Sequence, residues 1–208
     1  MTAGERLDAV LHDLRACRIC RDAPRYLPRL PHQPRPVIQA STTARLCIAG
    51  QAPGTRVHAS GRPFTDPSGV RLRRWLGIDE TVFYDRARVA VVPMGFCFPG
   101  QDAKGGDLPP RRECAPTWHE RVFAAMPQIE LVLAIGRYAQ DWHLGAPKGR
   151  GLTETVADWR GLLARPARPR VLPLPHPSWR NNAWLRQNPW FEAELVPVLR
   201  QEVARLIG

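Results

Sequence analysis

The chain has 208 residues, 44% of them hydrophobic, and a formal net charge of +11. Its length suits one domain with a sizeable core, and it contains no run of the roughly 18 apolar residues that a membrane helix needs. The N-terminus also lacks a secretory signal, so we expect a single cytoplasmic domain over residues 1–208, without a membrane span. The charge, almost all of it on arginine, favours a polyanionic partner such as nucleic acid.

The first 44 residues predict a helix followed by an irregular segment. Apolar residues have helical spacing from Leu7 to Leu14, and prolines are frequent from Pro24 to Pro36. We call residues 24–36 the strap and do not expect it to be a separate domain. This N-terminal region also carries the first two cysteines, Cys17 and Cys20.

The rest of the chain alternates between two kinds of apolar pattern. Continuous apolar runs bounded by Gly or Pro predict buried strands at residues 45–50, 89–94, 131–136 and 171–175. Helical spacing occurs at residues 70–76, 118–126, 138–144 and 190–207. This alternation predicts an α/β fold with a parallel sheet covered on both faces, and ligands then bind beyond the carboxyl ends of the strands.

Cysteines form two groups that indicate a metal centre. Cys17 and Cys20 form a C-x-x-C pair, whereas Cys97 and Cys114 flank a loop rich in Gly, Pro and charge. Without a secretion signal, metal ligation explains such clustering better than disulfides do. Cys47 stands apart in an apolar run and is expected in the core.

Ligand number alone does not identify the metal, because zinc and a [4Fe–4S] cluster both accept four thiolates. Four unrelated cysteines are a third interpretation. Zinc ribbons usually join two short C-x-x-C knuckles, and Cys97 and Cys114 are too far apart for a knuckle. The loop between them would be fixed at both ends and would present Arg111 and Arg112 to DNA.

Two polar side chains follow predicted strands. Gln51 lies in residues 50–54, Gly-Gln-Ala-Pro-Gly; its carboxamide can orient a water or a base edge but cannot serve as a general base. His176 follows the last strand, and a neutral imidazole there can donate a hydrogen bond to an oxygen that gains negative charge. The alternatives are an ordinary Gly-rich turn and a structural histidine.

Four motifs together resemble those of one enzyme family. In chain order they are residues 50–54, Gly61-Arg62-Pro63-Phe64, Cys97 with Cys114, and His176-Pro177-Ser178. They resemble the iron–sulfur uracil-DNA glycosylases, the branch of the uracil-DNA glycosylase superfamily numbered families 4 and 5, over about residues 7–200. The resemblance implies a three-layer α/β/α sandwich with a central four-stranded parallel sheet, and a damaged nucleotide flipped out of DNA into a pocket.

The same resemblance assigns roles to residues. It implies a [4Fe–4S] cluster, with zinc as the alternative, on Cys17, Cys20, Cys97 and Cys114. Gln51 would lie near the sugar and the attacking water, His176 would stabilise the departing base, and Phe64 would stack on it. The other base-binding residues would be Gly50, Ala52, Met94 and Gly95, and the DNA-binding residues would be Ser178, Trp179, Arg180 and Asn181, with Trp179 or Arg180 filling the vacated stack.

Two positions depart from the family pattern. The related enzymes commonly have Glu or an apolar residue where Gln51 stands, and Asn where Pro93 stands. Because Pro93 has no side-chain amide to read a base, the preference for uracil has to come from other groups or be relaxed.

The sequence therefore predicts a monofunctional DNA-repair glycosylase, expected to be a monomer, that hydrolyses the N-glycosidic bond of uracil or another deaminated base. A lyase route through a lysine imine is not expected, because Lys104 and Lys148 lie in loops away from the predicted pocket. The alternatives are a protein that binds uracil or abasic sites with little turnover and a zinc-stabilised structural protein that binds nucleic acid.

Overall fold

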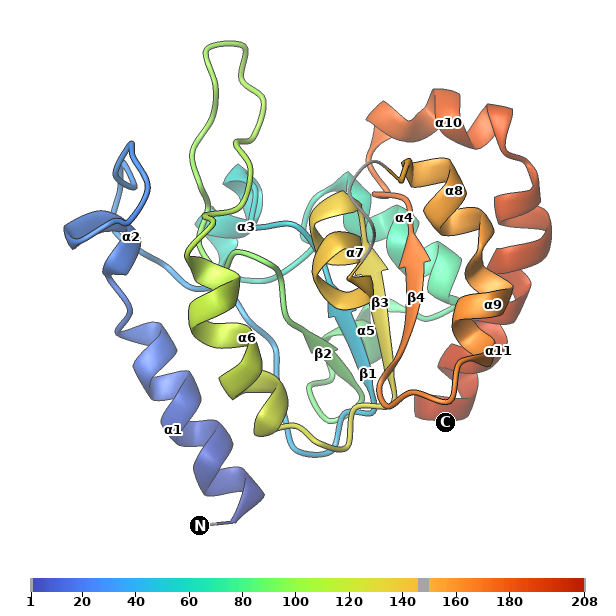
Figure 1. Cartoon of the computed structure of the whole chain (residues 1–208), viewed down its shortest axis with the longest axis horizontal. Helices are drawn as coiled ribbons and strands as arrows, with labels where there is room; N and C mark the ends of the chain where they lie inside the picture. Colours follow the sequence, from blue (N-terminus) through green and yellow to red (C-terminus); the bar gives the residue numbers. More distant parts are fainter. Residues whose placement is uncertain (1, 146–149, 208) are drawn as a thin grey trace.

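A sheet of four parallel strands forms the centre of the computed structural model, which describes residues 2–145 and 150–207 (Figure 1). The strands lie in the order β2-β1-β3-β4. Their bounds are Leu46–Ala49 for β1, Val89–Val91 for β2, Leu131–Ile135 for β3 and Arg170–Leu174 for β4. Each coincides with one of the predicted apolar runs, so the predicted four-stranded parallel sheet is confirmed.

Helices cover both faces of this sheet, which confirms the three-layer sandwich (Figure 1). In chain order they are α1 (Ala3–Arg15), α2 (Ile19–Asp22), α3 (Thr55–Ser60), α4 (Pro67–Leu76), α5 (Glu80–Tyr84), α6 (Cys114–Ala124), α7 (Arg137–Leu144), α8 (Leu152–Ala157), α9 (Trp159–Ala164), the 3₁₀ turn η1 (Trp179–Asn181), α10 (Asn182–Gln187), the π-helical turn η2 (Phe191–Leu195) and α11 (Val196–Ile207). None of the described helices is long and apolar enough to cross a membrane.

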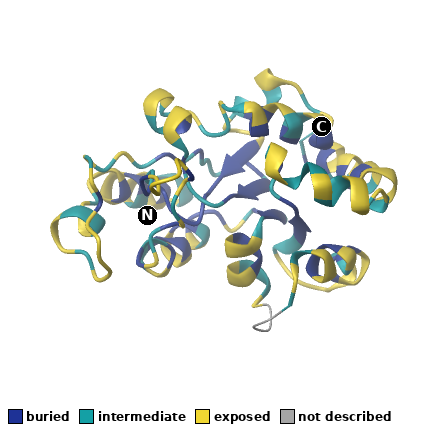
Figure 2. Ribbon diagram, turned by 90° about the horizontal axis from the view of Figure 1, so that it is seen from above, coloured by how far each residue is buried: buried dark blue, intermediate teal, exposed yellow. Residues whose placement is uncertain are grey.

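The two faces of the sheet belong to two separate apolar clusters, because successive side chains of a strand point to opposite sides. Leu46 and Ile48 of β1 pack with residues of α4, α5, α9 and α11. Cys47 and Ala49 face the other way, toward α1, α6 and α7. Cys47 is fully buried, as predicted. The buried strands and the exposed outer sides of the helices are visible in Figure 2.

Local signals set the start and end of α4, the helix that follows the motif of residues 61–64. The Asp66 side chain accepts a hydrogen bond from Gly69 N–H, and Pro67 occupies the first helical turn. Gly77 ends the helix in the left-handed conformation, with φ 70°. Because the cap fixes where α4 begins, it also fixes the position of Asp66 at the start of the helix.

The predicted C-terminal helix is divided in two. The π-helical turn η2 precedes α11, and Pro197 lies at the second position of α11. Proline has no backbone N–H to donate to the preceding turn, and a widened turn accommodates this loss. The helix therefore continues in the predicted region but not with regular geometry.

Candidate active site

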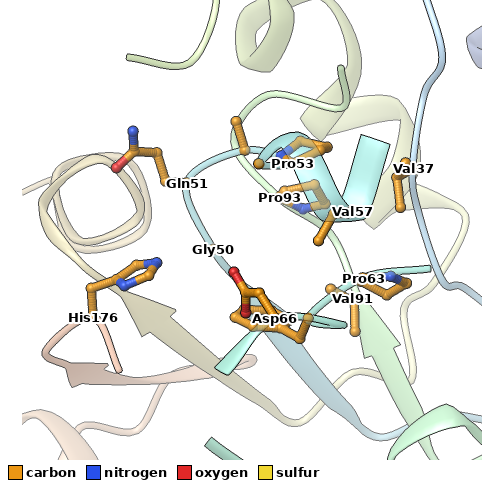
Figure 3. A pocket seen from close by; sticks show the side chains of 13 residues that line it. Val37, Gly50, Gln51, Pro53, Val57, Pro63, Asp66, Val91, Pro93 and His176 are labelled. Carbon is orange, nitrogen blue, oxygen red and sulfur yellow. The ribbon is translucent and has the colours of Figure 1, made fainter. Parts of the chain in front are cut away.

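A small cavity, partly open to solvent, lies at the carboxyl ends of β1, β2 and β4 (Figure 3). It is the position at which open parallel sheets bind ligands. The strand order explains this position. After β1 the chain forms β2 on one side of it and then β3 on the other, so the direction of the strand order reverses at β1. The cavity is lined by Val37, residues 50–54, Val57, Pro63, Phe64, Asp66, Val91, Pro93 and His176.

Most of the cavity wall is apolar, and its polar side chains are those of Gln51, Asp66 and His176. Pro93 forms part of the wall. Its carbonyl is 3.0 Å from Nε2 of the buried His119. Burial lowers the pKa of His119 to about 4, so its ring is neutral at pH 7 and donates through Nε2 to this carbonyl. Sequence reasoning did not identify His119, because a histidine inside a helix carries no signal of a contact with a distant carbonyl.

Phe64 lies against the turn that follows β1. A Cβ atom on Gly50 would be only 3.3 Å from Phe64 Cζ, so the absence of a side chain on Gly50 lets the ring approach the backbone. Phe64 itself has φ 54°, which is rare for a residue other than glycine and marks a locally strained backbone. The ring also packs edge-on against Phe83, at 6.0 Å between centroids. One face of an aromatic ring is thus held at the cavity.

His176 is held in one tautomer and one orientation. Its Nδ1 accepts a hydrogen bond from Ser178 N–H at 3.2 Å, so in the neutral ring Nε2 carries the proton. The Asn181 side chain donates to the His176 carbonyl at 2.7 Å. Burial lowers the pKa of His176, and the negative charge of Asp66 opposes that effect only in part. The residue therefore presents a neutral N–H donor at pH 7.

Asp66 is a cavity residue that sequence reasoning missed. It supplies the single carboxylate among the described residues that line this cavity. Its Oδ1 accepts from Gly69 N–H at 3.2 Å. From sequence alone, an aspartate directly before a proline is an ordinary helix cap, and that interpretation conceals any second role.

The other predicted base-binding residues lie in two different places. Gly50, Gln51 and Ala52 line the cavity, whereas Met94 and Gly95 do not. The backbone N–H groups of Met94 and Gly95 donate to the carbonyls of Gly50 and Gln51, both at 2.9 Å. Met94 is a core residue, and the side chain of Gln51 is 3.5 Å from the Leu108 carbonyl.

The predicted DNA-binding residues form a short turn after His176, in which Ser178 and Asn181 are partly buried. Trp179 is 73% exposed and Arg180 is also exposed, so Trp179 does not pack under the terminal helix. Arg71 of α4 donates to the Ser178 carbonyl at 3.1 Å and thereby connects this turn to α4. Asn181 is engaged by its hydrogen bond to His176.

All four predicted metal-binding cysteines line a second small, mainly apolar cavity. They are Cys17, Cys20, Cys97 and Cys114. Within the described part of the chain, however, no group of three or more His, Cys, Asp or Glu side chains has the geometry to hold a metal ion. The fold therefore brings the thiols to one cavity without arranging them as a coordination site.

Burial raises the pKa of the Cys20 thiol to about 11 and that of Cys97 to about 12. The pKa of Cys114 is also raised by burial. Thiolates in such surroundings need a nearby cation, so metal binding here would release protons. Four sulfur donors in one cavity fit the chemistry of a four-thiolate centre.

The predicted exposure of Arg111 is wrong. Its side chain is only 12% exposed and forms an ion pair with Glu113 at 3.0 Å. Its guanidinium also donates to the backbone carbonyls of Pro28, at 2.6 Å, and Tyr26. Arg111 thus joins the strap to the loop of residues 98–113, while its neighbour Arg112 is exposed. A sequence pattern cannot distinguish these two adjacent arginines.

Neither lysine lines the candidate active site in the part of the chain that the structure describes. Lys104 is exposed in the loop of residues 98–113. Lys148 lies outside the described residues.

A parallel α/β sandwich with an aromatic ring, an imidazole and a carboxylate around a small apolar cavity is suited to binding a planar group. The family model of the uracil DNA glycosylase superfamily matches residues 38–200, and the chain belongs to this superfamily. The family relationship supports a DNA glycosylase, a hydrolase whose substrate is DNA. The matched region contains Cys97 and Cys114 but not Cys17 and Cys20.

Among solved structures, the chain is similar to a solution NMR structure from Methanosarcina acetivorans, provisionally named a uracil DNA glycosylase. The sequence identity is 15% and the TM-score is 0.47. The alignment covers 80% of this chain and 96% of the other.

Proposed function

We propose that this protein is a monofunctional DNA glycosylase that removes uracil, and other deaminated bases, from DNA. The observation that carries the proposal is that Phe64, Asp66 and His176 line one cavity in a chain of the uracil DNA glycosylase superfamily. A cavity of this kind accepts a base only after the nucleotide has left the helical stack.

The proposed reaction is hydrolysis of the bond between C1′ and the base. The base stacks on Phe64, and the bonding electron pair moves to the base as the C1′–N bond breaks. The Nε2–H of His176 donates to the base oxygen that becomes negative, an interaction that strengthens as the bond breaks. The sugar acquires cationic character at C1′.

Water then completes the reaction. A water molecule forms the new bond to C1′, and Asp66 accepts the proton that the water loses. Gln51 can orient this water through its carboxamide but cannot remove the proton. The base anion then takes up a proton and Asp66 releases one, through solvent, so the products are a free base and an abasic sugar. Asp66 supplies an acid–base group, which supports turnover over simple binding of damaged DNA.

Selectivity among damaged bases is expected to be broad. Pro93 and the valines of the cavity wall offer no side-chain hydrogen bond to the base edge. Stacking on Phe64 favours planar bases without distinguishing among them. We therefore propose that uracil is one of several substrates.

Base release from a panel of oligonucleotides tests the proposed function. Uracil, hypoxanthine and xanthine would each be placed in single strands and opposite each normal base. We expect the wild-type protein to release uracil and the double variant Asp66→Asn/His176→Ala to release none. No release from any substrate by the wild-type protein would contradict the proposal.

We further propose that Cys17, Cys20, Cys97 and Cys114 hold a [4Fe–4S] cluster, with zinc as the second candidate. When bound, such a cluster would act as a structural cross-link between the N-terminal region and the loop of residues 98–113. The shared cavity and the absence of a second C-x-x-C pair support this assignment.

Cysteine variants test this metal assignment. Cys17→Ser and Cys114→Ser should lose iron, sulfide and the broad absorption expected at roughly 400 nm for an iron–sulfur protein. Cys47→Ala, which changes a buried cysteine outside the cavity, should retain all three. Stoichiometric zinc in a colourless wild-type protein would favour zinc, and an absence of both metals would contradict the assignment.

A further inference from the structure

An exposed group of basic and apolar side chains lies next to the cysteine cavity, outside the candidate active site. We call it the Tyr26 patch; it consists of Arg25, Tyr26, Leu27, Arg29 and Arg112. Leu27 is 81% exposed and Tyr26 is 41% exposed. The three arginines are exposed as well.

The arginines of the Tyr26 patch lack ion-pair partners in the described part of the chain, residues 2–145 and 150–207. Asp22, which forms ion pairs with Arg18 and Arg21, also interacts electrostatically with Arg29. The guanidinium of Arg112 instead lies over the Tyr26 ring, at 5.7 Å from its centre. Arginines beside an exposed aromatic ring are a composition typical of surfaces that bind nucleic acid.

The backbone beneath the Tyr26 patch is firmly held. Arg111 donates to the carbonyls of Tyr26 and Pro28, and Leu30 N–H donates to the Cys20 carbonyl at 2.8 Å. Two exposed apolar side chains are therefore displayed on a fixed support. They lie beside the exposed arginines, so apolar and basic side chains are presented together on this surface.

A chain of contacts connects this patch to the candidate active site. Arg111 belongs to the loop of residues 98–113, and the Leu108 carbonyl of the same loop faces the side chain of Gln51. In Figure 1, α2 and this loop lie at the end of the molecule toward which the strands point, the end that holds the cavity. DNA bound at the cavity can extend over this side of the molecule.

We propose that the Tyr26 patch is a second DNA-contact surface that binds the backbone of the duplex beside the extruded nucleotide. Its three guanidinium groups would contact phosphates, and Tyr26 with Leu27 would cover the sugars between them. This inference rests on the proposed function, because it places the duplex by the position of the cavity.

The salt dependence of DNA binding tests the inference. Each phosphate contact contributes about 0.9 to the slope of log K against log salt concentration. In the triple variant Arg25→Gln/Arg29→Gln/Arg112→Gln, we therefore expect the slope for an undamaged labelled duplex to decrease by about 2 to 3. Fluorescence anisotropy at several salt concentrations provides the measurement.

A matched variant controls for the loss of net charge. Arg86, Arg165 and Arg168 are also exposed, and they lie just before β2 and β4, at the amino ends of the strands and thus at the opposite end of the sheet. Changing these three to Gln removes the same charge but should leave the slope close to that of wild type. Equal slopes for the two triple variants would overturn the proposal.

The two proposals can fail separately. If the wild-type protein releases bases but the Tyr26 patch variant keeps the wild-type slope, the proposed DNA-contact surface is wrong and the proposed glycosylase activity is supported. If no base is released but the slope still depends on the Tyr26 patch, the proposed DNA-contact surface is supported and the proposed glycosylase activity is wrong. Thermal unfolding of each variant checks that the fold is unchanged.

Discussion

Replacing Asp66 by Asn is expected to slow base release by about 100- to 10,000-fold, the range that a positioned acid–base group contributes. An amide has nearly the shape of the carboxyl group but cannot accept the proton from water. Asn is as effective as Asp as a helix cap, so the hydrogen bond to Gly69 N–H and the start of α4 should persist. The rate would be measured under single-turnover conditions with excess enzyme.

Two controls make this prediction specific. Asp107 also acts electrostatically on His176 but is exposed and does not line the cavity, so Asp107→Asn should keep most of the activity. Gln51→Ala should cost less than Asp66→Asn if the carboxamide only orients water. Full activity of Asp66→Asn would show that Asp66 is a helix cap and no more.

Replacing Gly69 by Ala is expected to destabilise the fold by more than about 3 kcal/mol, at the high end for a single substitution. A Cβ atom at this position would lie 1.8 Å from the Phe64 carbonyl oxygen and 2.8 Å from its carbonyl carbon. Both are backbone atoms, so no side-chain rotation relieves the overlap. Either α4 or the strained segment around Phe64 must move.

Urea denaturation measures this effect, and Gly4→Ala provides the control. At Gly4, inside α1, a Cβ atom would be 3.8 Å from its nearest neighbour and alanine favours the helix. Gly4→Ala should therefore be neutral or stabilising. Any folded fraction of Gly69→Ala should also release bases slowly, because Phe64 is displaced. A wild-type denaturation midpoint for Gly69→Ala would refute the predicted overlap.

The sheet could be predicted because both of its faces are covered. A strand buried on both sides needs apolar residues at every position, which gives the continuous runs around Leu46 and Leu131. The short helices α3, α5, α8, α9 and α10 were not predicted, since none exceeds six residues. Two turns are too few for helical spacing to be recognised.

The candidate site was predictable only where its residues lie in motifs. Gln51 and His176 follow strands, and the strand ends meet at one edge of the sheet. Asp66 and His119 reach the same region from helices whose spacing in the sequence indicates only caps and core. Their contribution depends on how α4 and α6 pack, which single-sequence patterns do not specify.

For the cysteines, the sequence predicted which residues come together but not how their thiols are oriented. Clustering in the sequence predicted one centre, and the structure brings Cys17, Cys20, Cys97 and Cys114 to one cavity. The orientation of each thiol depends on the local backbone and on the group that is bound. Sequence spacing carries no information on either.

The cap of α4 differs from the other side-chain caps in how freely it can vary during evolution. Thr2 and Asp79 also accept hydrogen bonds at helix starts, and Ser, Thr, Asn or Asp serve there almost equally well. On the proposed mechanism Asp66 has no such freedom, because only a carboxylate can take the proton. Related sequences should therefore exchange residues freely at the positions of Thr2 and Asp79, and they should retain aspartate, or at most glutamate, at the position of Asp66.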